Sequence, residues 1–189
     1  MLSFKHTCCL AIVALGQLTA AGRGQAVPSA FGPGQGLWAG VEYSNIHAGF
    51  PYDSDQRLGG IGVFATDHLA GNLSVAGEAR FLRFNSFNGE TESHYLAGPR
   101  YRLPRFGRIQ PFAECLFGIG HIQFPYQIGS GTYFAVAPEA EITYRLSRRW
   151  ALRGTYDYQF WPGSPNVANE PDHAIRPNGF HAGLAFRIH

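Results

Sequence analysis

The stretch that decides the fold is Leu73–Phe84, LSVAGEARFLRF. Its residues sort into two alternating sets, Leu73, Val75, Ala79 and Phe81 in one and Ser74, Ala76, Glu78 and Arg80 in the other. A period of two is that of a β-strand, in which successive side chains point to opposite faces. The stretch therefore predicts a strand with one apolar face and one charged face.

The same alternation recurs in further segments along the chain. They are Leu37–Ile46, Arg57–Thr66, His94–Arg102, Ile109–His121, Phe134–Leu146, Trp150–Phe160 and Phe180–Ile188. With Leu73–Phe84 they make eight, an even number, and a tilted strand needs roughly 9 to 11 residues to cross the apolar layer of a membrane. The segments are of about this length, which is typical of a membrane barrel.

Composition excludes several other classes of protein. The chain has 189 residues, of which 24 are Gly, 12 Pro, 15 Phe and 9 Tyr, and only 15% are charged. The charged fraction is well below the roughly 25% of soluble domains, which argues against a helical bundle, and the aromatic content argues against disorder. No apolar run is long enough for a spanning helix, and the net charge of +2 gives no basic footprint for nucleic acid.

The first residues are expected to be an export signal. A polar head with Lys5 precedes the apolar run Cys8–Leu18, and small residues up to Ala26 suit cleavage. We therefore expect a signal peptide at residues 1–26, a flexible lead-in at 27–36 and the barrel at 37–189. The mature chain would keep Cys115 alone, so no disulfide could form within it.

The connections between the predicted strands alternate in length. Longer ones at 47–56, 85–93, 122–133 and 161–179 alternate with short turns at 67–72, 103–108 and 147–149. Outer-membrane barrels have long outer loops and short periplasmic turns. The charges are sorted as well, with Asp53, Asp55, Glu90, Glu92, Glu170 and Asp172 in the long connections and Arg105, Arg108, Arg148 and Arg149 in the short turns. The sequence thus predicts an acidic outer end and a basic inner end.

Lipid explains why the apolar face points outward. Only a closed barrel or a helix satisfies every backbone group in hydrocarbon, and an apolar outer band in water would be an aggregation hazard. Girdles of aromatic residues at the two interfaces are predicted from Tyr43, Tyr95, Tyr101, Trp150 and Phe160. Six acids and six bases project to the opposite face and are predicted to form a paired network in the lumen: Glu42, Glu78, Arg80, Arg100, Arg102, Glu114, Glu139, Glu141, Arg145, Arg153, Asp157 and Arg187. The predicted fold class is all-β, an eight-stranded antiparallel up-and-down transmembrane β-barrel.

The chain from residue 37 to 189 resembles the small outer-membrane β-barrel proteins of the OmpA/OmpX or opacity-porin type. The resemblance lies in the segment Tyr95–Tyr101, the turn Tyr144–Trp150 and the last strand Gly179–His189. It implies an outer-membrane location in a Gram-negative cell, contact with outer-membrane lipid, and recognition of the C-terminal strand by the barrel-assembly machinery. In that family the chain usually ends on an aromatic residue, whereas here Phe186 precedes a final His189.

The sequence shows no motif for catalysis, for a cofactor or for a metal. Gly59-Gly60-Ile61-Gly62 lies in a strand pattern without the Lys of a phosphate loop, and the scattered histidines lack close ligand spacing. An enzyme acting on lipid A would need Ser and His together on the membrane-facing surface, but Ser44, Ser74, His94 and His181 are expected to point inward. No enzymatic activity, cofactor or metal site is predicted.

Three functions remain open from the sequence. The first is a barrel with a plugged, salt-bridged lumen that acts in envelope structure or surface interaction through its long outer loops. The second is a narrow porin-like channel for small solutes or ions, which requires that charges of the lumen stay unpaired and admit water. The third is a soluble lipocalin-like carrier of a small ligand, which reverses the two faces. The loop partner is not identified by the sequence.

Overall fold

The computed structural model describes residues 36–48, 57–86, 88–164 and 175–188. Eight strands account for most of them: β1 (Trp38–His47), β2 (Arg57–Ala70), β3 (Leu73–Phe84), β4 (Thr91–Arg102), β5 (Ile109–Gln123), β6 (Ser130–Arg145), β7 (Trp150–Tyr158) and β8 (Asn178–Arg187). A short 3-10 helix, η2 (Pro125–Gln127), lies between β5 and β6. Within this described part, no helix is long and apolar enough to cross a membrane. The predicted signal peptide and nearly all of the predicted lead-in lie outside the described residues.

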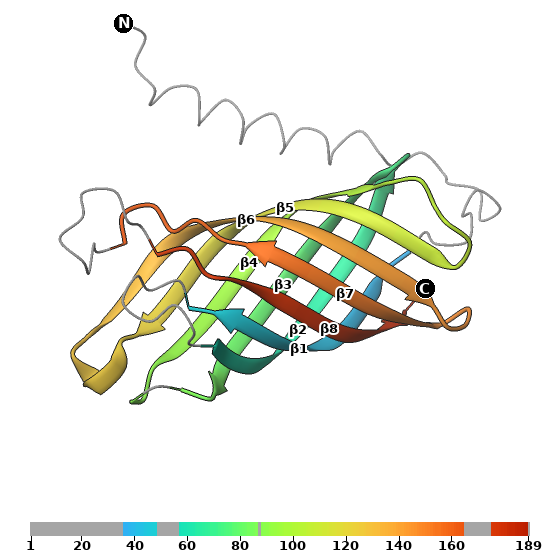
Figure 1. Ribbon diagram of the computed structural model, residues 1–189. Coiled ribbons are helices and arrows are strands. Elements are labelled where there is room, and N and C mark those ends of the chain that lie inside the picture. The colour runs from blue at the N-terminus through green and yellow to red at the C-terminus, as the bar shows by residue number, and fades with distance from the viewer. Residues whose placement is uncertain (1–35, 49–56, 87, 165–174, 189) are drawn as a thin grey trace, which may run out of the picture. The chain divides into compact units, whose positions relative to one another are not determined.

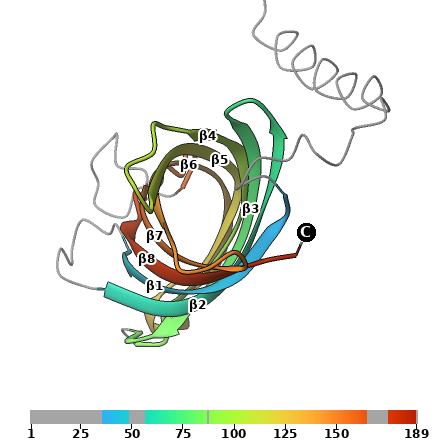
Figure 2. The same cartoon turned by 90° about the vertical axis from the view of Figure 1, so that its right-hand side faces the viewer.

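The strands form a closed barrel in which each strand pairs antiparallel with its neighbours in sequence (Figure 1). β1 and β8 close the ring: Trp38 pairs with Arg187, and the register continues without a shift to His47 opposite Asn178. Figure 2 shows this ring from the end at which β8 finishes. The structure confirms the eight-stranded, all-antiparallel barrel that the alternation predicts.

The connections are less uneven than the sequence suggested, because most strands continue past the predicted ends. The turn between β2 and β3 consists only of residues 71–72, where Gly71 adopts a positive φ of 57°. The connection between β5 and β6 is shortened to residues 124–129. That outer connection is no longer than the inner turn at 103–108, so the alternation of long and short connections is weaker than predicted. Glu92 belongs to β4 and faces the lumen, which corrects its assignment to a loop. Asp53, Asp55, Glu170 and Asp172 lie outside the described residues.

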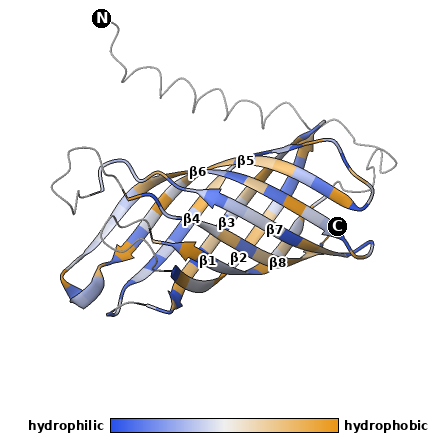
Figure 3. Cartoon of the chain, in the orientation of Figure 1, coloured by the Kyte–Doolittle hydropathy of each residue, from blue (hydrophilic) through white to orange (hydrophobic). Residues whose placement is uncertain are grey.

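The outer face of the barrel is apolar around its circumference. Val41, Ile61, Val63, Ile142 and Phe180 are all more than half exposed, each at an outward position of its strand. Figure 3 shows apolar and polar residues alternating along the strands. This is the arrangement of a barrel that exposes its apolar face to hydrocarbon rather than to water.

The interior is filled by side chains and changes in character along its length. At the loop end, buried apolar residues form one cluster, hereafter the apolar plug: Ile46, Ala48, Leu58, Ala76, Leu82, Leu96, Leu116, Ile122, Ala135, Ala137, Trp161 and Ile175. A smaller cluster of Phe64, Ala151 and Ala185, with Trp38 against it, lies toward the short turns. Buried charged residues fill the middle.

Candidate functional site

Arg80 on β3 is the centre of the charged part of the lumen. Its guanidinium is fully buried and forms ion pairs with carboxylates from three other strands as well as its own. Nε donates to Glu42 on β1 (2.9 Å), Nη1 to Asp157 on β7 (2.7 Å), and Nη2 to Glu139 on β6 (3.1 Å) and to Glu78. One side chain therefore spans the barrel, because the planar guanidinium presents several donors in different directions.

Two further arginines extend this arrangement toward the short turns. Arg153 on β7 forms ion pairs with Glu141 (2.8 Å), Glu42 (3.5 Å) and Glu78. Arg100 on β4 donates to Glu114 (2.9 Å) and pairs with Glu141. We call these residues the central network: Glu42, Glu78, Arg80, Arg100, Glu114, Glu139, Glu141, Arg153 and Asp157. It contains six carboxylates and three guanidiniums, so each arginine serves several acids.

The central network holds nine of the twelve residues that the sequence analysis assigned to the lumen. The other three, Arg102, Arg145 and Arg187, lie on the inward face but are only half-buried. They occupy the last positions of their strands or nearly so, at the short-turn end, and Arg145 is close enough to the other two to interact electrostatically with them. Strand alternation predicts the face of these three arginines but not their depth in the barrel, and their depth places them at the short-turn end.

The apolar plug is completed by a residue outside the strands. Trp161 follows β7 and is fully buried. The centre of its ring lies 5.4 Å from the ring centre of His94 and 6.2 Å from the ring centre of Tyr133. The backbone N–H of Trp161 donates to the carbonyl of Ile175, and Ser164 links the same two residues. Gly120 leaves the space for the indole, since a Cβ there would lie 2.1 Å from it. Trp161 lies in the connection predicted at 161–179, outside any alternating segment, so this role is not predicted from the sequence.

A chain of hydrogen bonds joins the plug to the central network. Trp161 Nε1 donates to Gln159 (2.9 Å), and the amide of Gln159 donates to Asp157 (2.7 Å) and to His94 Nδ1 (3.0 Å). His94 Nε2 then donates to the buried carboxylate of Glu92 at 3.0 Å. The indole N–H, the Gln159 amide and both nitrogens of His94 are thus paired, as buried polar groups need to be.

Ser44, His181 and Asp157 form a hydrogen-bonded series of the kind found in serine hydrolases. His181 Nδ1 lies 2.9 Å from Ser44 Oγ, and Nε2 lies 3.0 Å from Asp157 Oδ1. Because a carboxylate can only accept, Nε2 donates to Asp157, and in a neutral imidazole Nδ1 then accepts from the hydroxyl. However, Ser44 is fully buried in the lumen, so no substrate reaches its Oγ. The sequence analysis placed Ser44 and His181 on the inner face but did not foresee this contact, which follows from the β1–β8 register.

Three carboxylates of the central network come close enough together to hold a metal ion. Oxygen atoms of Glu78, Glu114 and Glu139 lie within 4.8 Å of one another. Arg80 forms ion pairs with Glu78 and Glu139, and Arg153 lies within 4.0 Å of all three carboxylates. The guanidiniums therefore supply the positive charge that a cation would bring, and this group is a part of the ion-pair network.

Aromatic side chains contact two arginines of the central network toward the short-turn end of the lumen. The guanidinium of Arg100 lies 3.3 Å from the ring centre of Phe112, and that of Arg153 lies 4.3 Å from the ring centre of Phe64. Cation–π contacts of this kind stabilise a desolvated charge. Beyond them comes a ring that we call the arginine rim: Arg102, Arg105, Arg108, Arg145, Arg148, Arg149 and Arg187.

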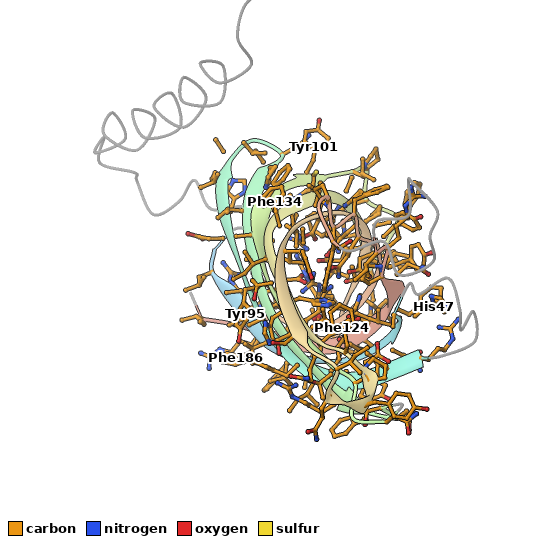
Figure 4. The ribbon with its side chains drawn as sticks, turned by 90° about the vertical axis from the view of Figure 1, so that its left-hand side faces the viewer. His47, Tyr95, Tyr101, Phe124, Phe134 and Phe186 are labelled. Carbon is orange, nitrogen blue, oxygen red and sulfur yellow. The ribbon has the colours of Figure 1, made fainter. Side chains whose placement is uncertain are left out.

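The five aromatic residues assigned to the membrane interfaces all lie on the outer face. Tyr43, Tyr95, Tyr101, Trp150 and Phe160 are between 42% and 51% exposed. Tyr101 and Trp150 are at the short-turn ends of β4 and β7, whereas Tyr43 is nearer the middle of β1 and Phe160 lies beyond the end of β7. Figure 4 shows the barrel from the loop end, with Tyr95 and Tyr101 labelled and side chains filling the interior.

Comparisons with known proteins identify the fold and nothing finer. No family model matches the sequence, and no curated protein is similar to it at a significant level. Neisserial surface protein A has a similar structure, with a TM-score of 0.56 and 12% identity, covering 80% of this chain and 96% of that one. The N-terminal barrel of Pseudomonas aeruginosa OprF is also similar, with a TM-score of 0.52 and 11% identity, covering 80% of this chain and 98% of that one. So is Ail, the attachment invasion locus protein of Yersinia pestis, with a TM-score of 0.50 and 15% identity, covering 82% of this chain and 99% of that one. The chain has the fold of the small outer-membrane β-barrel proteins.

Proposed function

We propose that this chain is an outer-membrane barrel with a closed lumen that acts in envelope structure or in interactions at the cell surface. The fold and the apolar outer face support a location in the outer membrane. The short turns and the end of β8 would face the periplasm. The connections at 48–56, 85–90, 124–129 and 159–177 would face the outside of the cell.

The observation that carries the proposal is the position of Arg80. Its guanidinium contacts acids from β1, β3, β6 and β7 and is fully buried, as are the side chains of those acids. An ion that passes along the lumen would have to break these pairs and then displace the Trp161 indole. Since separating a buried pair costs several kcal/mol, the two regions act as barriers in series.

The channel and the soluble carrier each require a polarity of the lumen or of the outer face that differs from the one observed. A channel needs a wet path lined by polar groups, yet the loop end of the lumen is packed with Leu58, Leu82 and Leu116, which are all fully buried. A soluble carrier needs a polar outer face and an apolar cavity, whereas here the outer face is apolar and the middle of the interior is charged.

Gel mobility of the purified chain, refolded in detergent, tests the membrane barrel against the soluble carrier. A closed barrel resists the detergent of the gel until it is boiled, so the unheated sample is expected to migrate differently from the boiled one. The absence of a shift, together with good solubility in buffer without detergent, would refute the membrane barrel and favour the carrier.

A strain that lacks the gene, compared with the same strain complemented by it, tests the biological role. We expect either greater sensitivity to detergent, for a role in the envelope, or weaker attachment to other cells, for a surface interaction. Unchanged behaviour in both assays would contradict the proposal.

The proposed location in the outer membrane also implies two partners of the chain. Outer-membrane lipid would contact the outward side chains, and the barrel-assembly machinery would bind β8. Phe186, on the outer face of β8, is the aromatic nearest the end of the chain and packs against Trp150 with ring centres 4.9 Å apart. Replacing Phe186 by Ser would then slow assembly in cells more than it slows refolding in detergent.

A further inference from the structure

An open hollow lies at the short-turn end of the barrel, where the β6–β7 turn meets the end of β8. It has a volume of about 370 Å³ and is lined by Arg148, Arg149, Phe186, Arg187 and Ile188. The site therefore combines the two arginines of the β6–β7 turn with two apolar side chains at the end of the chain's last strand, β8. Nothing in the closed lumen or in the proposed function uses it.

The backbone fixes the shape of this hollow. The N–H of Arg187 donates to the carbonyl of Arg149 at 2.9 Å, which ties β8 to the turn. Ser147 Oγ accepts hydrogen bonds from the N–H groups of Arg149 (3.2 Å) and Trp150 (3.1 Å), so the turn itself is held. The arginines consequently leave the turn at defined positions beside β8.

The short turns beside the hollow are basic, and Asp67, an exposed acid at this end of β2, is separated from β8 by β1. The hollow belongs to the arginine rim, and the turns at 71–72, 103–108 and 146–149 contain no acidic residue. Arginine is suited to phosphate because its planar guanidinium can donate two parallel hydrogen bonds to two oxygens. An anion with several oxygens, and a phosphate above all, fits this end of the barrel.

The apolar part of the hollow distinguishes a lipid from a free anion. Phe186 is 37% and Ile188 54% exposed, and both belong to the outer face that would contact hydrocarbon. The hollow is therefore continuous with the apolar band, and the guanidiniums are at its periplasmic edge. An amphiphile with an anionic head and an apolar tail satisfies both parts at once.

We propose that this hollow binds the headgroup of an anionic phospholipid in the periplasmic leaflet, with the phosphodiester against Arg148 and Arg149 of the β6–β7 turn. The acyl chains of that lipid run along Phe186 and Ile188. This inference rests on the proposed membrane placement of the chain and adds a specific lipid contact to it.

Native mass spectrometry of the full chain in detergent micelles tests the site, with phosphatidylglycerol and phosphatidylcholine as probes. The barrel is expected to retain phosphatidylglycerol in preference to phosphatidylcholine. Because a basic residue near anionic lipid contributes about 1 kcal/mol, the double variant Arg148→Gln/Arg149→Gln should retain roughly ten- to thirtyfold less phosphatidylglycerol. Inorganic phosphate should not displace the lipid, since it cannot use the apolar part of the hollow.

The matched control is Arg105→Gln/Arg108→Gln, which removes the same charge from the same rim but from another turn. It should retain the lipid as the unaltered chain does. Equal loss in both double variants, unchanged retention in Arg148→Gln/Arg149→Gln, or displacement by inorganic phosphate alone would overturn the headgroup site.

Gel mobility of each sample separates the two proposals. A chain that shows no shift on boiling refutes the barrel, whereas a shifted chain without a preference for phosphatidylglycerol refutes only the lipid site. The single variants Arg148→Gln and Arg149→Gln, with a smaller expected loss, replace the double variant if it does not refold.

Discussion

The apolar plug and the central network fill the same lumen by opposite means. In the plug, Leu58, Leu82 and Leu116 pack with Trp161, and stability comes from apolar area and close contact. In the central network, three arginines hold six carboxylates that are all buried. The difference teaches that the interior of one barrel can be packed by apolar side chains in one region and by ion pairs in another, and that the two regions should respond to different substitutions. The plug should be sensitive to shape, and the network should be sensitive to the loss of a single charge.

The largest effect is expected from Arg80→Leu. Four acids, Glu42, Glu78, Glu139 and Asp157, would lose a buried partner, and breaking a buried ion pair typically costs about 3–5 kcal/mol because a charge is left uncompensated. Urea unfolding of the barrel in lipid vesicles measures this free energy.

The control for that variant is Arg57→Leu at the start of β2. Arg57 is exposed and donates one hydrogen bond to Asn45 at 3.3 Å, so its loss should change the free energy of unfolding by about 0.5 kcal/mol or less. A loss below about 1 kcal/mol for Arg80→Leu would show that the carboxylates do not depend on this arginine.

An intermediate effect is expected in the plug from Gly120→Val. The added side chain would meet the Trp161 indole, and overpacking of this kind typically costs about 1–3 kcal/mol. The tryptophan emission spectrum of the chain should also shift to longer wavelength, because Trp161, which is fully buried, would leave its position. Gly154→Val is the matched control, because a Cβ at Gly154 meets no atom within 4 Å. Equal effects of the two substitutions would contradict the packing of Trp161 against Gly120.

The smallest effect is expected from Ser44→Ala, which tests whether the Ser44–His181–Asp157 series is structural. Removal of the hydroxyl loses one hydrogen bond of His181, at a cost of about 1 kcal/mol. A fluorophosphonate probe should not label the unaltered folded chain, because Ser44 is fully buried. Labelling that disappears in Ser44→Ala would instead show an accessible nucleophile.

The sequence predicted the strands well because lipid and lumen impose opposite polarities on alternate residues. Leu73–Phe84 has the same bounds in the structure as in the sequence analysis, and Glu78 and Arg80 face the lumen as their positions in that pattern require. The period-two pattern is local, so it can be read without knowing the partners of a strand.

The plug was not predicted, because at the loop end both faces of the strands are apolar. Leu82, Leu96 and Leu116 occupy inward positions, but their polarity does not set them apart from the outward residues beside them. Trp161 lies outside any alternating segment. One signal was present: Gly120 interrupts the inward face of β5, and a glycine there leaves room for a bulky side chain from elsewhere.

The pairing within the central network also depends on closure. Arg80 and Asp157 are 77 residues apart and meet because the strands tilt and the ring closes between β8 and β1. Arg102, Arg145 and Arg187 face the same lumen but are the last residues of β4, β6 and β8, at the short-turn end. Strand alternation shows on which face a residue lies but not how far along the barrel axis it is.

Planar-bilayer recording tests the closed lumen most directly. The purified barrel, shown to be folded by its gel shift, is reconstituted beside an open porin that serves as a positive control for insertion. We predict no stepwise current above baseline for the unaltered chain, and none for Trp161→Ala, because the central network still closes the lumen when the plug is weakened. Stepwise current through the unaltered chain would contradict a closed lumen and would establish the narrow channel instead.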